Sequence, residues 1–253
     1  MDLARRSLAA LDLTCLDEHA TPARIEGLCR QAASPWGQVA AVCVYPEYIR
    51  TARLALDRAG AGAVRVATVA NFPFGRAEAD AAALDVQRAV AAGADEVDVV
   101  FPWRSLLQGD ARCGESLVAA CREACGERTV LKVILESGML PTHDALRDAC
   151  QAALRGGADF LKTSTGKSAV HATTKAAEVM LDCIAEHGGT CGFKASGGLR
   201  ELADVAPYFT LAERILGRGW ATPERFRIGA SSLLDALHAE LGGQATGTSA
   251  GGY

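Results

Sequence analysis

The sequence predicts an α/β protein that folds as a single (β/α)8 TIM barrel, and three observations predict it. Short runs of β-branched residues alternate with Ala-rich segments that carry Arg and Glu, which is the pattern of consecutive βα units. Eight such runs recur at intervals of roughly 30 residues, the length that a strand, a crossover helix and two loops need. Eight units in 253 residues match a barrel, whereas a doubly wound sheet commonly has about five or six strands.

Residues typical of helix ends divide the chain into these units. Thr21 followed by Pro22 is typical of a helix start, with Thr as the N-cap and Pro in the first turn. Residues 34–37, Ser-Pro-Trp-Gly, are expected to end that helix before the second strand, and Gly93 is expected to end a later helix. The expected strands are residues 11–16, which give the weakest signal, 39–45, 64–70, 96–101, 130–135, 160–164, 191–195 and 226–230.

The barrel is expected to occupy residues 1–241. A chain of 253 residues with 49% hydrophobic residues can bury a substantial core and is near the usual upper size for one domain. Residues 242–253, GGQATGTSAGGY, offer little that could pack except the final tyrosine. They are expected to form a flexible C-terminal tail.

Composition and charge exclude several classes of function. Thirty acidic residues outnumber 26 Lys and Arg, so a net charge of -4 provides no basic field to attract nucleic acid or an anionic membrane. The longest apolar run, residues 39–45, is too short to cross a bilayer, and the N-terminus has no signal-peptide pattern. We therefore expect a soluble, cytoplasmic protein.

The cysteine and glycine patterns also argue against a disulfide framework, a metal site and a nicotinamide cofactor. The nine cysteines are an odd number without a CxxC pair, which indicates a reducing compartment. Cys121 and Cys125 lie four residues apart, but no further Cys or His ligand is evident near them. A GxGxxG motif after the first strand is missing, and the five histidines lie outside the expected strands. We expect neither a metal nor a cofactor, and no catalytic histidine.

Charged residues inside the expected strands are the strongest functional signal. In residues 96–101, Glu-Val-Asp-Val-Val-Phe, one face is apolar and suits a helix layer, so Asp98 should point into the barrel. The same alternation places Lys132, Lys162 and Lys194 on the inner face of the next three strands. A single lysine at a strand end would ordinarily extend to solvent. Three on adjacent strands beside an aspartate indicate a functional cluster instead.

This cluster suggests a specific chemistry. Three ammonium groups beside one or two carboxylates cannot all stay ionised cheaply in one cavity, so one lysine should become partly neutral. A neutral lysine amine attacks carbonyl groups and forms a Schiff base, which stabilises a neighbouring carbanion as an enamine. The spacing leaves open whether Lys162 or Lys194 is the nucleophile, but it indicates that one activates the other.

The motifs that contain these residues occur in a characteristic combination. They are DLTCL (residues 12–16), CVYP (43–46), TVANFPFG (68–75), DEVDVVFPWR (95–104), LKVILESG (131–138), ADFLKTSTGK (158–167), GFKASGGLR (192–200) and RIGASSLL (227–234). In this order they resemble deoxyribose-phosphate aldolase, a family of metal-independent class I aldolases with a (β/α)8 barrel. The resemblance implies reversible cleavage of 2-deoxy-D-ribose 5-phosphate into acetaldehyde and D-glyceraldehyde 3-phosphate, in deoxyribonucleotide and carbohydrate catabolism. It further implies small sugar phosphates and aldehydes as partners, and a homodimer as a possible assembly.

The resemblance also implies roles for individual residues. Lys162, in LKTSTG, matches the Schiff-base nucleophile, and Lys194, in FKASGG, matches the lysine that lowers the nucleophile's pKa. Asp98 matches the residue that moves protons together with a water molecule, and Lys132 matches a lysine that keeps this aspartate ionised and oriented. Asp12 matches an active-site aspartate of the family, although an Asp before a short strand can equally cap a turn.

A phosphate site is expected in the loops that follow the last three strands. In barrels of this kind, the loops after strands seven and eight and a helix N-terminus form a recurrent phosphate site. Either serine of the pair that follows the eighth strand could instead serve only as a helix N-cap. The residues expected to bind phosphate are Thr165, Gly166, Lys167, Gly197, Gly198, Ser231 and Ser232.

The sequence leaves alternatives open for the role of Tyr253 and for the exact reaction. Tyr253 resembles the terminal tyrosine of the longer-chain branch of the family, which enters the active site and assists proton transfer, but it can equally be an ordinary disordered chain end. Cys43 is expected to be a small buried apolar side chain outside the catalytic set. One alternative function is a related Schiff-base aldolase or transaldolase with a different donor. Another is a catalytically silent barrel that binds a sugar phosphate.

Overall fold

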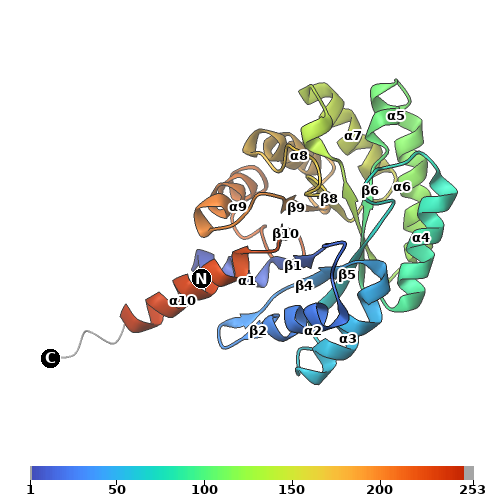
Figure 1. The fold of residues 1–253 in the computed structure, drawn as a ribbon. Coiled ribbons are helices and arrows are strands. Elements are labelled where there is room, and N and C mark those ends of the chain that lie inside the picture. Colours follow the sequence, from blue (N-terminus) through green and yellow to red (C-terminus); the bar gives the residue numbers. More distant parts are fainter. Residues whose placement is uncertain (1, 248–253) are drawn as a thin grey trace.

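The computed structural model describes residues 2–247, and in this part of the chain eight parallel strands form a closed barrel surrounded by helices (Figure 1). The eight barrel strands follow the order β1-β10-β9-β8-β7-β6-β5-β4 around the barrel, so each strand pairs with its neighbours in sequence and the first pairs with the last. All eight expected strands are confirmed. Their bounds are β1 Leu11–Cys15, β4 Ala41–Val44, β5 Arg65–Ala70, β6 Glu96–Val100, β7 Val130–Ile134, β8 Phe160–Lys162, β9 Gly192–Ser196 and β10 Phe226–Ala230.

Helices follow the strands and cover the outside of the barrel (Figure 1). The expected start at Thr21 is confirmed, because its hydroxyl accepts a hydrogen bond from the backbone N–H of Arg24 at 3.3 Å and satisfies an end group of the helix. Thr142 and Thr173 cap two later helices in the same way. The helices are α1 Leu3–Ala9, α2 Pro22–Gln31, α3 Ile49–Arg58, α4 Ala79–Ala92, α5 Trp103–Leu107, α6 Ala111–Cys125, α7 His143–Arg155, α8 Thr174–Glu186, α9 Leu202–Leu216 and α10 Leu233–Gly247, with 3-10 turns η1 Pro46–Tyr48 and η2 Ser137–Met139.

The segment after α2 differs from the expectation. Residues 34–37 do not simply end the helix: β2 (Ala33–Ser34) and β3 (Gly37–Gln38) pair antiparallel and form a small hairpin outside the barrel. Gly37 has a φ of +134°, a conformation that a residue with a Cβ rarely adopts. The ring of Trp36 packs against His238 of α10, with 5.0 Å between the ring centroids, so the hairpin contacts the last helix.

The C-terminal boundary also differs from the expectation. The barrel was expected to end at residue 241, but α10 continues to Gly247, so the first six residues of the expected tail are helical. Leu241 is buried, and Trp36 lies against Gly242, where a Cβ would be 3.7 Å from its ring. This packing compensates for the weak helix propensity of the glycines. Tyr253 lies outside the described residues.

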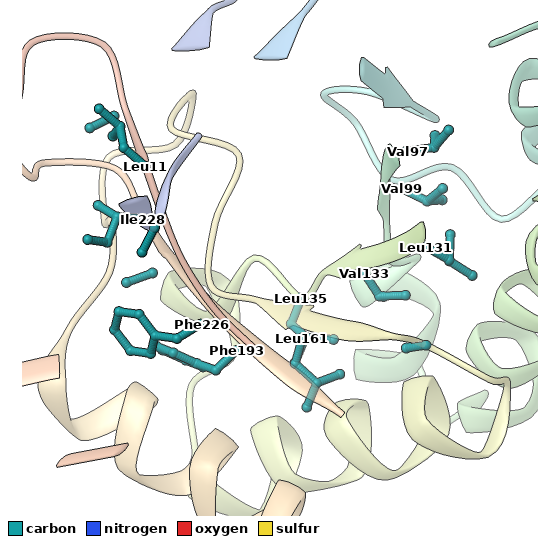
Figure 2. Packing of buried hydrophobic residues seen from close by; sticks show 14 of the residues in the cluster. Leu11, Val97, Val99, Leu131, Val133, Leu135, Leu161, Phe193, Phe226 and Ile228 are labelled. Atoms are coloured by element: carbon teal, nitrogen blue, oxygen red, sulfur yellow. The ribbon is translucent and has the colours of Figure 1, made fainter. Parts of the chain in front are cut away.

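The outer face of the strands forms the main hydrophobic core, between barrel and helices (Figure 2). Val97, Val99, Leu131 and Val133 point to this side and are fully buried, as the alternation in the sequence predicts. Burial of each such side chain contributes roughly 1.5–3 kcal/mol. Within residues 2–247, none of the helices is both long and apolar enough to span a membrane.

The inner face of the barrel divides into an apolar part and a charged part. On β4 and β5 the cluster inside consists of the small side chains Ala41, Cys43, Ala67 and Val69. The inner faces of β1, β6, β7, β8, β9 and β10 instead carry the buried acidic and basic side chains described below. Buried charge is expensive unless it is paired or functional, so the charged part of the inner face positions the candidate site.

Candidate active site

The strand register brings the predicted cluster together. Asp98 on β6 lies opposite Lys132 on β7, and Lys162 at the end of β8 lies opposite Lys194 on β9. Side chains that are level with one another on neighbouring parallel strands point to the same side of the sheet. Asp12, in β1, completes the group from the other side of the barrel. The four side chains predicted for the cluster, and Asp12 with them, therefore lie inside the barrel.

Asp98 is the centre of the cluster. Its Oδ1 accepts a hydrogen bond from Nζ of Lys132 at 2.8 Å. Its Oδ2 accepts hydrogen bonds from both Lys162 and Lys194, each at 2.8 Å. One carboxylate thus holds the three amines in a fixed arrangement.

Asp12 belongs to the same network and does not cap a turn with its side chain. Its Oδ2 lies 2.5 Å from Nζ of Lys194 and 3.4 Å from Nζ of Lys132. Its Oδ1 accepts a hydrogen bond from Arg227 at 2.7 Å. Arg227 in turn pairs with Glu96 at 2.8 Å.

Sequence reasoning missed Arg227 and Glu96 as members of the site. The sequence pattern puts Glu96 on the same face as Asp98, but its partners lie on three other strands, and the contact with Arg227 follows only from the closed barrel. Arg227 precedes Gly229 by two residues in β10, and the same alternation that identified the lysines could have placed it inside.

Gly229 makes room for this network. A Cβ at this position would lie 3.0 Å from Cε of Lys194 and 2.9 Å from Cβ of Ser196. Contacts this short require a neighbour to move. A glycine in β10 therefore allows the lysine side chain to reach Asp98.

The electrostatic environment separates the three lysines. Burial lowers the pKa of each, but nearby carboxylates outweigh burial at Lys132 and Lys194, whose pKa values are raised. For Lys162, burial and the positive charge of Lys194 outweigh the attraction of Asp98, and its pKa is lowered. Burial opposes ionisation of Asp98, yet the three amines hold the pKa of Asp98 well below its usual value. Asp98 is thus a carboxylate, and Lys162 is the lysine with the greatest tendency to be neutral.

Access to the outside also distinguishes Lys162. Lys132 and Lys194 have no exposed surface, whereas Lys162 is 3% exposed and lines a cavity of about 1150 Å³. The walls of the cavity include the loops after β1, β8, β9 and β10, at the carboxyl ends of the strands, where barrel enzymes place their active sites. A carbonyl compound in this cavity can contact the amine of Lys162.

The cavity also collects the predicted phosphate ligands. Gly197 and Gly198 have φ values of +87° and +76°, and a Cβ at Gly197 would lie 2.9 Å from His171. Arg24, His171 and Arg200 line the same cavity, although sequence reasoning did not select them. The predicted residues found in the wall are Thr165, Gly166, Lys167, Gly197, Gly198, Ser231 and Ser232.

Glu136 holds the loop after β8 in place. This buried residue has a φ of +52°, and its carboxylate accepts hydrogen bonds from the Thr165 hydroxyl at 2.6 Å and the Ser168 hydroxyl at 2.9 Å. Lys167, in the same loop, donates a hydrogen bond from Nζ to the backbone oxygen of Leu16 at 2.8 Å. The loop is therefore attached to the loop after β7 on one side and to the loop after β1 on the other.

Cys43 lies within the small apolar cluster on the inner face of β4 and β5. Burial raises the pKa of its thiol, so the side chain is neutral. It is near enough to Lys162 and Asp98 to interact with their charges. This placement agrees with the expectation of a small buried apolar residue outside the catalytic set.

Together, fold and site define a class of protein. A buried lysine with a lowered pKa, held by a carboxylate at the open end of a (β/α)8 barrel, is the arrangement of an enzyme that acts on carbonyl compounds through a lysine, as class I aldolases do. The chain belongs to the DeoC/LacD family of aldolases, whose family model matches residues 6–238.

Solved structures of similar proteins agree with this assignment. One from Toxoplasma gondii ME49, provisionally assigned as a deoxyribose-phosphate aldolase, shares 26% sequence identity over 96% of this chain and 94% of that chain, with a TM-score of 0.86. Another provisionally assigned deoxyribose-phosphate aldolase, from Coccidioides immitis, shares 28% identity over 95% of this chain and 87% of that chain, with a TM-score of 0.81. The deoxyribose phosphate aldolase from Aeropyrum pernix shares 27% identity over 94% and 91% of the two chains, with a TM-score of 0.73.

Proposed function

We propose that this aldolase reversibly cleaves 2-deoxy-D-ribose 5-phosphate into acetaldehyde and D-glyceraldehyde 3-phosphate, in the cytoplasm and within deoxyribonucleotide catabolism. The observation that carries the proposal is the position of Lys162. Of the three buried lysines around Asp98, this one has a lowered pKa and lines the cavity. The similarity to deoxyribose-phosphate aldolases at 26–28% identity over nearly the full chain supports the choice of substrate.

The reaction begins at the aldehyde carbon of the open-chain sugar. The neutral amine of Lys162 attacks C1, and loss of water from the resulting carbinolamine gives a protonated Schiff base. Asp98 lies 2.8 Å from Nζ and, together with a water molecule, accepts and returns the protons of these steps. Lys132 and Lys194 keep Asp98 ionised because each donates a hydrogen bond to it.

Carbon–carbon cleavage follows from the Schiff base. Asp98, through the water molecule, accepts the proton of the C3 hydroxyl as the C3 oxygen forms a carbonyl, the bond between C2 and C3 breaks, and its electron pair moves into the cationic imine to form an enamine. Glyceraldehyde 3-phosphate leaves, the enamine is protonated at C2, and hydrolysis releases acetaldehyde and the free amine. Asp12 acts as a positioning residue in this scheme, because it holds Lys194 beside Asp98.

The apolar inner face of β4 and β5, near the amine of Lys162, suits a two-carbon donor. The small side chains Ala41, Cys43, Ala67 and Val69 form the apolar inner face on this side, and Cys43 interacts with Lys162. Apolar walls lack partners for the hydroxyl groups of a longer donor, and burial of an unpaired hydroxyl is unfavourable. This favours acetaldehyde over a hydroxylated donor.

The cavity at the carboxyl ends of the strands suits a phosphate group. Gly197 and Gly198, both with positive φ, line the cavity, and Ser231 and Ser232 lie immediately before α10. A helix N-terminus offers free N–H groups and a favourable dipole for an anion. Thr165, Gly166 and Lys167 complete this proposed phosphate site from the loop after β8.

Tyr253 is the remaining part of the proposal. We assign to it the assistance of proton transfer at the methyl carbon of the donor, on the resemblance of the chain end to the longer-chain branch of the family.

A substrate comparison tests the proposed function. The purified protein is assayed for aldehyde release from 2-deoxyribose 5-phosphate, from unphosphorylated 2-deoxyribose and from aldol adducts of larger donors. We expect the highest kcat/KM for the phosphorylated deoxy sugar, with the difference from 2-deoxyribose mainly in KM. Preference for a larger donor would point to a related Schiff-base aldolase or transaldolase. Binding without turnover of any substrate would point to a silent sugar-phosphate-binding barrel.

A further inference from the structure

A second layer of buried charge lies beneath the lysine cluster. Glu96 stands at the start of β6, two residues before Asp98, and its carboxylate accepts hydrogen bonds from both terminal nitrogens of Arg227 at 2.8 and 3.0 Å. Arg227 also donates to Asp12 at 2.7 Å, and Nζ of Lys132 lies 2.5 Å from Glu96. Glu96 is fully buried and Arg227 is 3% exposed. We call Glu96 and Arg227 the floor pair.

The charges of this network do not balance. Three carboxylates, those of Asp12, Glu96 and Asp98, face four basic side chains. If all seven groups were ionised, one positive charge would have no counterpart in a region of low dielectric. Arginine keeps its proton at any accessible pH, so the excess is relieved at a lysine. The four basic side chains are Lys132, Lys162, Lys194 and Arg227.

The ion pairs show which lysine has the fewest carboxylate partners and so loses its proton most readily. Lys132 lies within 3.4 Å of carboxylate oxygens of Asp12, Glu96 and Asp98. Lys194 pairs with Asp12 and Asp98, whereas the salt bridge found for Lys162 is with Asp98 alone. Lys162 is thus the most weakly held cation of the network.

We propose that the floor pair selects Lys162 as the neutral amine by setting this balance of charge, and that its two members act on Lys162 in opposite directions. The inference rests on the proposed Schiff-base function. Without Arg227, three lysines would face three carboxylates, and Lys162 would keep its proton. Without Glu96, four basic groups would face two carboxylates, and Lys162 would lose its proton more readily. Glu96 and Arg227 are positioning residues, because they act through Asp12, Lys132 and Asp98.

Other charged and titratable groups face these residues as well. Lys162 faces Asp98, Lys194 and the neutral thiol of Cys43. Arg65 on β5 lies 3.3 Å from Glu96, and Glu224 interacts with Arg227, but both side chains are exposed, and solvent screens their charges. The buried members therefore dominate the balance.

The test compares the wild type with Arg227→Gln, Glu96→Gln and the double variant. For each full-length protein, the rate of imine formation with acetaldehyde is measured across the neutral and alkaline range, with cyanoborohydride to trap the imine and intact mass to count it. We expect Arg227→Gln to raise the midpoint of the pH profile by on the order of one pH unit, and Glu96→Gln to lower it. The double variant should return close to the wild type, and Arg227→Lys, which keeps the charge, should also stay close to it.

A purely structural role would not give this pattern. Loss of packing alone would lower the rate at every pH and leave the midpoint in place, and that result would overturn the inference. So would shifts of both single variants in the same direction. If circular dichroism shows that Arg227→Gln does not fold, Glu96→Gln and the double variant decide the question. A downward shift of the midpoint in Glu96→Gln that disappears in the double variant supports the inference. A shift of the same size in both variants refutes it. Absence of imine in the wild type would refute the proposed function, whereas imine with unmoved midpoints would refute this inference alone.

Discussion

Replacement of Lys194 by methionine removes a positive charge next to the proposed nucleophile while it keeps most of the side-chain volume. Nζ of Lys194 and Nζ of Lys162 each lie 2.8 Å from the same oxygen of Asp98, so the two nitrogens are at most about 5.6 Å apart. At an effective dielectric constant of about 20, two unit charges at this distance repel by about 3 kcal/mol. This corresponds to about 2 pKa units.

The sign of the effect follows from the lost repulsion. Without the neighbouring ammonium group, protonated Lys162 is more stable and its pKa rises toward the value of an ordinary lysine. At neutral pH the fraction of free amine, and with it the rate of imine formation, should fall by about 100-fold. The acidic limb of the pH profile of kcat/KM should move up by about 2 pH units.

The assay is the pH dependence of 2-deoxyribose 5-phosphate cleavage, with thermal unfolding as a check on folding. Lys194→Arg keeps the positive charge, and its acidic limb should stay near that of the wild type even where its rate is lower. An acidic limb that does not move in a folded Lys194→Met variant would refute the electrostatic role of Lys194.

Three further predictions concern the space around the network, the loop after β8 and the chain end. Gly229→Ala places a Cβ 3.0 Å from Cε of Lys194, so we expect a loss of about 1–3 kcal/mol in the free energy of unfolding by urea titration. Gly243→Ala, where a Cβ meets nothing within 4 Å, should be neutral or slightly stabilising, because alanine favours a helix more than glycine does. Equal stability of the two variants would contradict the close packing. Glu136→Gln weakens the hydrogen bonds to Thr165 and Ser168, so KM for the phosphorylated substrate should rise several-fold, by about 1 kcal/mol of binding, with kcat little changed in steady-state kinetics. A fall in kcat alone would argue against a role of Glu136 in holding the loop after β8 for phosphate binding. Deletion of Tyr253 should slow turnover and the exchange of the acetaldehyde methyl protons, followed by NMR, without a change in the unfolding curve, and unchanged kinetics would exclude its role.

The sequence was sufficient to predict the barrel because each βα unit carries its own local signals. Alternation placed Asp98, Lys132, Lys162 and Lys194 on the inner face of four adjacent strands, and the register confirms this placement. The hairpin β2–β3 could not be predicted, because strands of two residues have no periodicity. The helical residues beyond 241 were missed because local propensity of glycine disfavours a helix there.

The distinction between the lysines required the three-dimensional structure. Lys162 and Lys194 are equivalent in the strand pattern, and they differ only in the number of carboxylate partners and in access to the cavity. Arg227, on β10, contacts Asp12 on the neighbouring strand β1 and Glu96 on β6 across the barrel. Both partners are far from Arg227 in the sequence. Such contacts arise from barrel closure and leave no local trace in the chain.

The most direct test of the account is to trap the imine and locate it. The protein is treated with acetaldehyde and borohydride, digested, and mapped by mass spectrometry, with Lys162→Ala as the control. We expect a two-carbon label on the peptide that contains Lys162, and none on the control protein. A label on the peptide with Lys194, or no label in a folded wild-type protein, would contradict the assignment of Lys162 as the nucleophile.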